Sequence, residues 1–181
     1  MKKVLIAGVG NVLLGDDGVG PFVTRLLASR YEFESGVEIE DLGTPALDFI
    51  DNLLGLDALI VVDSVENGKP AGSVTLYRKP HLVRHAPGVR MDPHSPAMSE
   101  SIMAADLIGT GPREVLLIGI SGGSYEAGCD LSAPVKASVE AAIREVIREL
   151  DRLRIPHHLN ENAGSPAIWW SDATPAVTTA G

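Results

Sequence analysis

The sequence predicts an α/β fold: a three-layer sandwich with a mostly parallel, twisted sheet of about five strands flanked by helices. Short apolar runs alternate with amphipathic helical stripes along the chain, as they do where helical crossovers join parallel strands. Residues 58–62 are apolar without interruption, which is typical of a strand covered on both faces. The length of 181 residues suits one domain with one sizeable core.

The first half of that domain is expected to alternate strands and helices. Strands are predicted at residues 3–9, 37–42 and 57–63 from their apolar content. A helix is predicted over residues 17–30, with Pro21 in its first turn, where no intrahelical N–H is needed. A shorter helix is predicted to begin after Thr44 as its N-cap.

The second half continues the alternation. Residues 74–78 are expected to form an edge strand, and residues 80–96 a polar loop punctuated by proline. A helix beginning at Ser95 or Ser99 should lead to a buried strand over residues 115–120. Ser132 is expected to cap the last long helix.

After Pro156 the periodic pattern ends. We therefore expect a single α/β domain over residues 1–155 and a flexible tail over residues 156–181, which is rich in Asn, Ala, Ser, Pro and Thr. Trp169 and Trp170 are the exception in this tail. Two adjacent tryptophans indicate either docking on this or another protein or an unpacked chain end.

Composition excludes several classes of protein. The net charge is −9 and the basic residues are scattered, which argues against binding to nucleic acid. The single cysteine, Cys129, excludes an intramolecular disulfide and a multi-cysteine zinc site. The apolar run near the N-terminus is too short for a signal peptide or a membrane span. We expect a cytoplasmic protein that does not insert into membranes and works as a monomer.

The first predicted strand ends in a glycine loop followed by two carboxylates, Asp16 and Asp17. Open α/β sheets bind ligands at the carboxyl ends of their strands. Leu13 stands where the third glycine of a dinucleotide-binding motif would be, which weakens that reading. The alternative is that both aspartates only stabilise a helix N-terminus. For Asp16 we favour such a cap over the role of a helper base.

Asp63 and His94 complete a candidate site. Asp63 ends the most apolar strand, where a carboxylate more often faces a ligand than the core; otherwise it caps the following loop. His94 lies in the loop before the next helix. With Asp17, these residues form a mixed oxygen and nitrogen donor set suited to a divalent transition metal with open positions.

These motifs resemble those of the nickel–iron hydrogenase maturation proteases. The resemblance extends from residue 1 to about residue 153, with the motifs in the same order and at similar spacing. The motifs are residues 8–20, Gly43-Thr44, residues 61–64 and Pro93-His94-Ser95.

The resemblance implies an aspartic-type endopeptidase that removes the C-terminal extension of a hydrogenase large-subunit precursor after nickel insertion. It implies that Asp17, Asp63 and His94 contact the nickel and are the catalytic residues. It also implies that the nickel belongs to the precursor, and we expect that other divalent metals can occupy the site in vitro. Asn11, Asp16, Gly43 and Thr44 are expected to line the substrate cleft.

Three alternatives remain open at this level. A nickel-checking chaperone would bind the same precursor without cutting it, since completing a metal site serves recognition as well as hydrolysis. A nucleotide-binding domain is a weaker alternative. A general metallopeptidase would cleave casein-like proteins.

Overall fold

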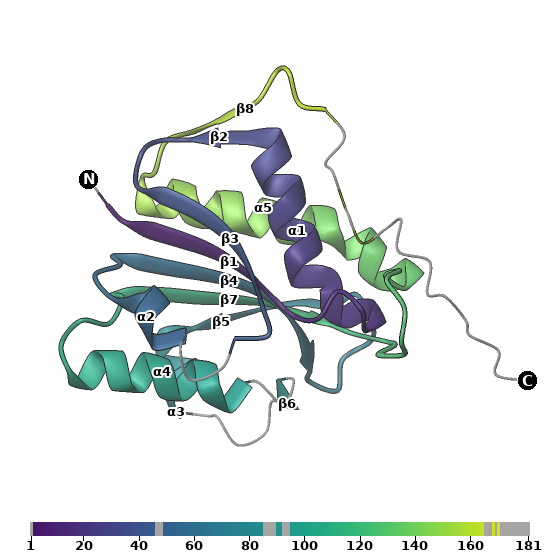
Figure 1. Ribbon diagram of the computed structural model, residues 1–181, viewed down its shortest axis with the longest axis horizontal. Coiled ribbons are helices and arrows are strands. Elements are labelled where there is room, and N and C mark those ends of the chain that lie inside the picture. Colours follow the sequence, from purple (N-terminus) through teal and green to yellow (C-terminus); the bar gives the residue numbers. More distant parts are fainter. Residues whose placement is uncertain are drawn as a thin grey trace, which may run out of the picture.

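The computed structural model describes residues 2–45, 49–84, 90–91, 95–164, 168 and 170. Its main sheet runs in the order β3-β1-β4-β7-β5, and a short strand, β6, pairs with β4 (Figure 1). Pairing is parallel from β3 to β7, whereas β5 and β6 are antiparallel to their neighbours. This confirms the predicted fold class. The strands are β1 (Val4–Val9), β3 (Val37–Gly43), β4 (Ala58–Glu66), β5 (Val74–Arg78), β6 (Arg90–Met91) and β7 (Glu114–Ser121).

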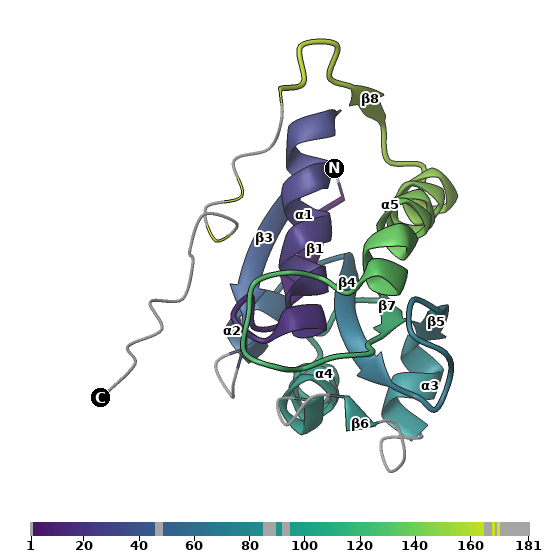
Figure 2. The same ribbon diagram turned by 90° about the vertical axis from the view of Figure 1, so that its right-hand side faces the viewer.

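Helices cover both faces of this sheet (Figure 2). One face packs against α1 (Val19–Arg30) and α5 (Ala133–Leu153), and the other against α2 (Phe49–Leu53), α3 (Lys79–Arg84) and α4 (Ser95–Leu107). Successive residues of β4 serve the two layers in turn because side chains alternate along a strand. Ile60 and Val62 join the core under α1 and α5, whereas Leu59 and Val61 join the other core.

Helix α1 approaches the sheet unusually closely because Gly20 has no side chain. A Cβ atom on Gly20 would lie 2.3 Å from the carbonyl oxygens of both Val9 and Val62. Gly8 in β1 faces the same contact, since a Cβ there would lie 2.6 Å from the carbonyl oxygen of Gly20. The close helix–strand packing that a dinucleotide-binding motif obtains from its third glycine is therefore obtained here from Gly8 and Gly20.

Some predicted boundaries were wrong. The chain makes a 3-10 turn, η1 (Gly15–Gly18), before α1 begins at Val19 rather than at Asp17. Helix α2 is described from Phe49 onward, and residues 46–48, on which its predicted first turn falls, lie outside the described part of the chain. Helix α3 lies where a loop was expected, and its Leu82 is buried in the core that the sheet shares with α2 and α4.

The tail prediction was wrong for residues 157–159. They form β8 (His157–Leu159), which pairs antiparallel with β2 (Tyr31–Phe33). The Tyr31 ring contacts His157 edge-on. Each strand has only three residues, too few for a recognisable pattern, and each is paired with a segment far away along the chain.

Trp170 is 2% exposed. Of the alternatives for the tryptophan pair, this burial supports docking on the protein itself; Trp169 lies outside the described residues. Within the described segments, no helix combines the length and apolar character needed to cross a membrane.

Candidate active site

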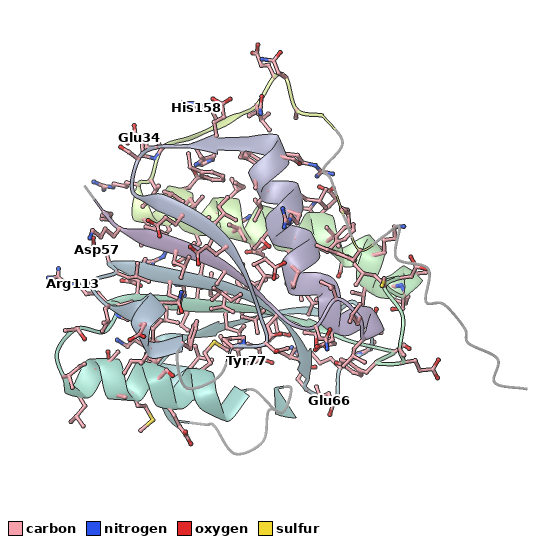
Figure 3. The ribbon with its side chains drawn as sticks, in the orientation of Figure 1. Glu34, Asp57, Glu66, Tyr77, Arg113 and His158 are labelled. Atoms are coloured by element: carbon pink, nitrogen blue, oxygen red, sulfur yellow. The ribbon has the colours of Figure 1, made fainter. Side chains whose placement is uncertain are left out.

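The candidate site lies at the edge of the sheet where the parallel strands end. In Figure 3, Asp57 marks the beginning of β4 and Glu66 its far end, where the chain also leaves β1 and enters η1. Carboxyl ends of parallel strands at one edge are the usual ligand position in open α/β folds. The glycine loop after β1 brings Asp17 to this edge.

Asp17 is buried, with 3% of its surface exposed, and both carboxylate oxygens are held. The backbone N–H of Asn11 donates to Oδ2 at 2.7 Å, and the Ser64 hydroxyl donates to Oδ1 at 3.1 Å. Gly10 allows the loop to close because a Cβ there would lie 1.8 Å from the Asp17 carbonyl oxygen. Its φ of +131° also favours glycine.

Asp63 lies in β4 and is 1% exposed. Its neighbour Ser64 bonds to Asp17, so the structure brings Asp17 and Asp63 to the same edge of the sheet. The Asp63 and Ser64 side chains lie on opposite faces of β4, since Asp63 shares its face with Val61 and Val65 and Ser64 does not. Burying charged carboxylates is costly unless polar groups or cations compensate them.

Asp16 does not have the role that was expected of it. It is 0% exposed and accepts four hydrogen bonds from the loop between β7 and α5. Gly123 N–H, Ser124 N–H and the Ser132 hydroxyl donate to Oδ2 at 2.8–2.9 Å, and Ser132 N–H donates to Oδ1 at 2.7 Å.

This bonding decides what Asp16 can do. Burial alone would raise the pKa of Asp16, but the hydrogen bonds from Gly123, Ser132 and Ser124 outweigh it and lower the pKa below its usual value. Asp16 is therefore a structural carboxylate that joins two loops. It is neither a helper base nor a cap of α1, and it has no free surface for substrate. Ser132 occupies the N-cap position of α5, but its hydroxyl bonds to Asp16 instead of capping that helix.

The other expected cleft residues lie on the rim of this edge. The Asn11 side-chain oxygen accepts from Leu13 N–H at 3.0 Å, which shapes the loop. The Gly43 carbonyl accepts from Gly10 N–H at 2.8 Å, and its own N–H donates to Asp41. The Gly43 amide is therefore used internally, contrary to the idea that it holds substrate. Thr44 is exposed, and its contact with substrate stays a prediction.

Sequence reasoning missed Ser64 and Tyr125 as members of the site. The Tyr125 side chain lies near Ser64, and partial burial together with the charges of Glu66, Asp17 and Asp16 raises the pKa of Tyr125 above its usual value. Gly122 provides the space, since a Cβ there would lie 2.3 Å from the Tyr125 hydroxyl oxygen. The Gly122-Gly123 pair was the only sequence signal for this contact.

His94 lies outside the described residues, so its position relative to the carboxylates stays a prediction. Among the residues that are described, no group of three or more His, Cys, Asp or Glu side chains could hold a metal ion. The described site therefore contributes two buried carboxylates, which suit a divalent cation whose other ligands come from elsewhere.

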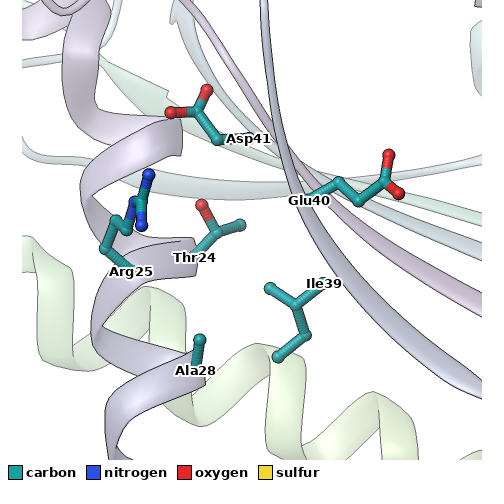
Figure 4. A pocket seen from close by; sticks show the side chains of 6 residues that line it. All are labelled: Thr24, Arg25, Ala28, Ile39, Glu40 and Asp41. Carbon is teal, nitrogen blue, oxygen red and sulfur yellow. The ribbon is translucent and has the colours of Figure 1, made fainter.

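A separate hollow of about 300 Å³ opens between α1 and β3 (Figure 4). Arg25 from the helix and Glu40 and Asp41 from the strand provide its charged groups. Along β3 the hollow extends as far as Asp41, and neither Asp17 nor Asp63 lines it.

This fold and site define a class: an α/β protein with a buried acidic site at the strand ends. Residues 21–149 match a family model described as "Hydrogenase maturation protease". The chain belongs to the hydrogenase maturation protease family. It is therefore an endopeptidase of hydrogenase maturation, which confirms the enzyme class and the family resemblance inferred from the motifs.

Individual relatives agree with the family model. The "Hydrogenase expression/formation protein HoxM" of Azotobacter vinelandii is 34% identical over 149 residues, covering 82% of this chain and 72% of the relative. The "Hydrogenase 2 maturation protease" of Escherichia coli is 28% identical, with 82% and 90% covered. The solved structure of the hydrogenase maturating endopeptidase HybD from E. coli superposes with a TM-score of 0.79 at 25% identity, covering 87% of this chain and 98% of that one.

Proposed function

We propose that this endopeptidase removes the C-terminal extension of a nickel-loaded hydrogenase large-subunit precursor. The observation that carries the proposal is the buried Asp17 carboxylate, held at the strand ends by Asn11 and by Ser64, which follows the buried Asp63 in β4. Nickel is part of the substrate in this scheme. Asp17 and Asp63, with His94, complete its coordination when the precursor docks.

The chemistry required is hydrolysis of one peptide bond. A divalent ion can polarise the scissile carbonyl or lower the pKa of a bound water that then attacks it. Asp17 and Asp63 contribute oxygen ligands that hold the metal next to that bond. The carbon–nitrogen bond breaks as water adds, and the leaving amine takes up a proton. No side chain of the protein has to form a covalent intermediate.

The test uses the full chain with an authentic precursor, nickel-loaded or nickel-free, and reads the mass of the precursor's C-terminus. We expect loss of the extension only with nickel. Asp17→Asn and Asp63→Asn should each lower the rate at least about 100-fold, in line with losses of key electrostatic groups. Asp51→Asn, which changes an exposed aspartate on α2, should leave the rate unchanged.

Other outcomes would overturn the proposal in distinct ways. Tight binding of the nickel-loaded precursor without cleavage would favour the chaperone. Cleavage regardless of nickel, or cleavage of casein, would favour a general peptidase. Full activity in Asp17→Asn would remove this carboxylate from the site.

We also propose that the protein works in the cytoplasm as a monomer and binds neither nucleic acid nor membrane. The single cysteine and the net charge of −9 support this setting. Size-exclusion chromatography with light scattering checks the oligomeric state.

A further inference from the structure

We propose that Leu13 and Leu14 form an apolar docking point, which takes one apolar side chain of the precursor close to the bond that is cut. This inference rests on the proposed function for the identity of the partner. It adds a determinant of substrate binding that depends on neither nickel nor the carboxylates.

The two leucines are exposed although the chain beside them is buried. Leu13 is 53% exposed and Leu14 is 38% exposed, whereas Asp16 and Asp17 are 0% and 3% exposed. Tyr125, on the loop that bonds to Asp16, is 37% exposed. Large apolar side chains that stay in water forgo the free energy of burial. Single ones are ordinary on a surface, but a group of them beside a site indicates a place where another molecule binds.

Hydrogen bonds hold the turn that carries the leucines in one shape. Within the turn, the N–H groups of Leu13 and Leu14 donate to the side-chain and backbone oxygens of Asn11, both at 3.0 Å. Across to the loop before α5, Gly128 N–H donates to the Leu13 carbonyl at 2.9 Å, and Gly15 N–H donates to the Gly128 carbonyl at 2.8 Å. A turn that is already fixed loses little conformational freedom when a partner binds, so apolar contact there adds directly to affinity.

These bonds also decide which kind of group the leucines can take. Both backbone groups of Leu13 are used within the protein, and so are those of Leu14, whose carbonyl accepts from Asp17 N–H at 3.1 Å. An extended substrate segment therefore finds no free N–H at either residue with which to pair as an added strand. The leucine side chains remain, and an apolar side chain is the group that gains free energy by covering them.

The position of the turn limits where that side chain can lie in the precursor. Only Gly15 and Asp16 separate Leu14 from Asp17, and the Asp17 N–H bonds back to Leu14. An extended chain advances about 3.3–3.6 Å per residue, so we expect the apolar residue within about three positions of the cut when the scissile bond lies at Asp17.

The first experiment compares KM and kcat on nickel-loaded precursor for the wild type, Leu13→Gln and Leu13→Met. Glutamine keeps the length of the side chain but is polar, whereas methionine stays apolar. Because 53% of Leu13 remains to be covered, we expect KM to rise about 5–10-fold in Leu13→Gln. The kcat should stay within about 2-fold, since this contact is made equally in the ground state and the transition state. Leu13→Met should behave like the wild type.

Leu107→Gln is the matched surface control. Leu107 is 89% exposed at the end of α4, which leads into the beginning of β7 and so lies at the opposite edge of the sheet from the site. This variant should leave KM unchanged, and all three variants should melt like the wild type. A lower melting temperature in Leu13→Gln alone would show that the leucine is a structural contact and would overturn the docking role.

The second experiment locates the contact on the precursor. Each apolar residue within about three positions of the cut is replaced by Asn, one residue in each precursor variant. One replacement should raise the KM of the wild type about as much as Leu13→Gln does. It should have little further effect on Leu13→Gln, since both changes remove the same contact. Independent effects at every position would refute the contact.

The outcomes separate this inference from the proposed function. Unchanged KM in Leu13→Gln on a precursor that is cleaved would overturn the docking point and leave the proposed function standing. If the wild type binds the precursor without cleaving it, the proposed function fails, and the dissociation constant takes the place of KM in the same comparison. No binding by the wild type would overturn both.

Discussion

Replacing Asp16 by asparagine should destabilise the whole domain although the change is isosteric. The carboxylate is fully buried and accepts four hydrogen bonds, three on one oxygen and one on the other. An amide has only one acceptor oxygen. The best orientation of the introduced amide keeps that oxygen toward Gly123, Ser124 and the Ser132 hydroxyl, and turns its NH2 group against the Ser132 N–H.

The magnitude follows from these contacts. One buried N–H left unsatisfied costs about 1–3 kcal/mol, and three bonds that lose a charged acceptor each weaken by about 1 kcal/mol. Together these contributions amount to about 4–6 kcal/mol, a large part of the roughly 5–15 kcal/mol that stabilises a typical domain.

Urea denaturation at pH 7, followed by circular dichroism, measures this free energy of unfolding. The matched control is Asp130→Asn, which changes an exposed aspartate in the same loop and should alter stability by less than about 0.5 kcal/mol. A loss below about 1 kcal/mol in Asp16→Asn would show that the four contacts contribute far less than their geometry indicates. A comparable loss in Asp130→Asn would mean that the loop is generally sensitive to such changes.

Two further predictions concern stability. Glu149 is 4% exposed and hydrogen-bonded to Arg78 and Arg152, which outweigh its burial and lower its pKa from 4.5 to about 2; the folded state thus holds its proton less tightly than the unfolded state. The interactions of Glu149 with the two arginines contribute roughly 3 kcal/mol, which is present above pH 4.5 and is lost as the pH falls toward 2. Chemical denaturation between pH 7 and pH 3 should therefore show a steeper loss of stability in the wild type than in Glu149→Gln. Parallel stability curves for the two proteins would contradict this prediction. Gly20→Ala should prevent stable folding or, for a cost of about 3 kcal/mol, lower the melting temperature by about 6–12 °C, because its Cβ would lie 2.3 Å from two carbonyl oxygens. Gly164→Ala, whose Cβ meets nothing, should melt like the wild type in differential scanning calorimetry.

The predicted layers and most strands follow from local patterns. The uninterrupted apolar run over residues 58–62 belongs to a strand that is covered on both faces, and the regular apolar stripe of α5 belongs to a helix that packs on the sheet. Both patterns can be read from neighbouring residues alone. Helix α3 lacked such a stripe, since Leu82 is its one apolar side chain described as buried. The pair β2 and β8 could not be predicted because each strand is stabilised by a partner more than a hundred residues away.

The site shows the same division between local and long-range information. Asp63 could be singled out because it ends an uninterrupted apolar run, and Asp17 because it follows the glycine loop after the first apolar strand. The true role of Asp16 depends on donors at Gly123, Ser124 and Ser132, which only the folded chain brings near. Tyr125 was missed for a related reason, since a tyrosine in a variable loop carries no periodic signal.

Strand β4 has a consequence for how damage elsewhere in the molecule would reach the active site. Its consecutive residues Asp63 and Ser64 face different helical layers, one shared with Val61 and Val65 and the other with Val62. A cavity opened beneath α4 would disturb Asp63 first, and a cavity beneath α1 would disturb the Ser64 contact to Asp17 first. The positions of the site residues thus depend on the packing of both hydrophobic cores. Inactivating substitutions should therefore be scattered through both layers instead of clustering around the carboxylates.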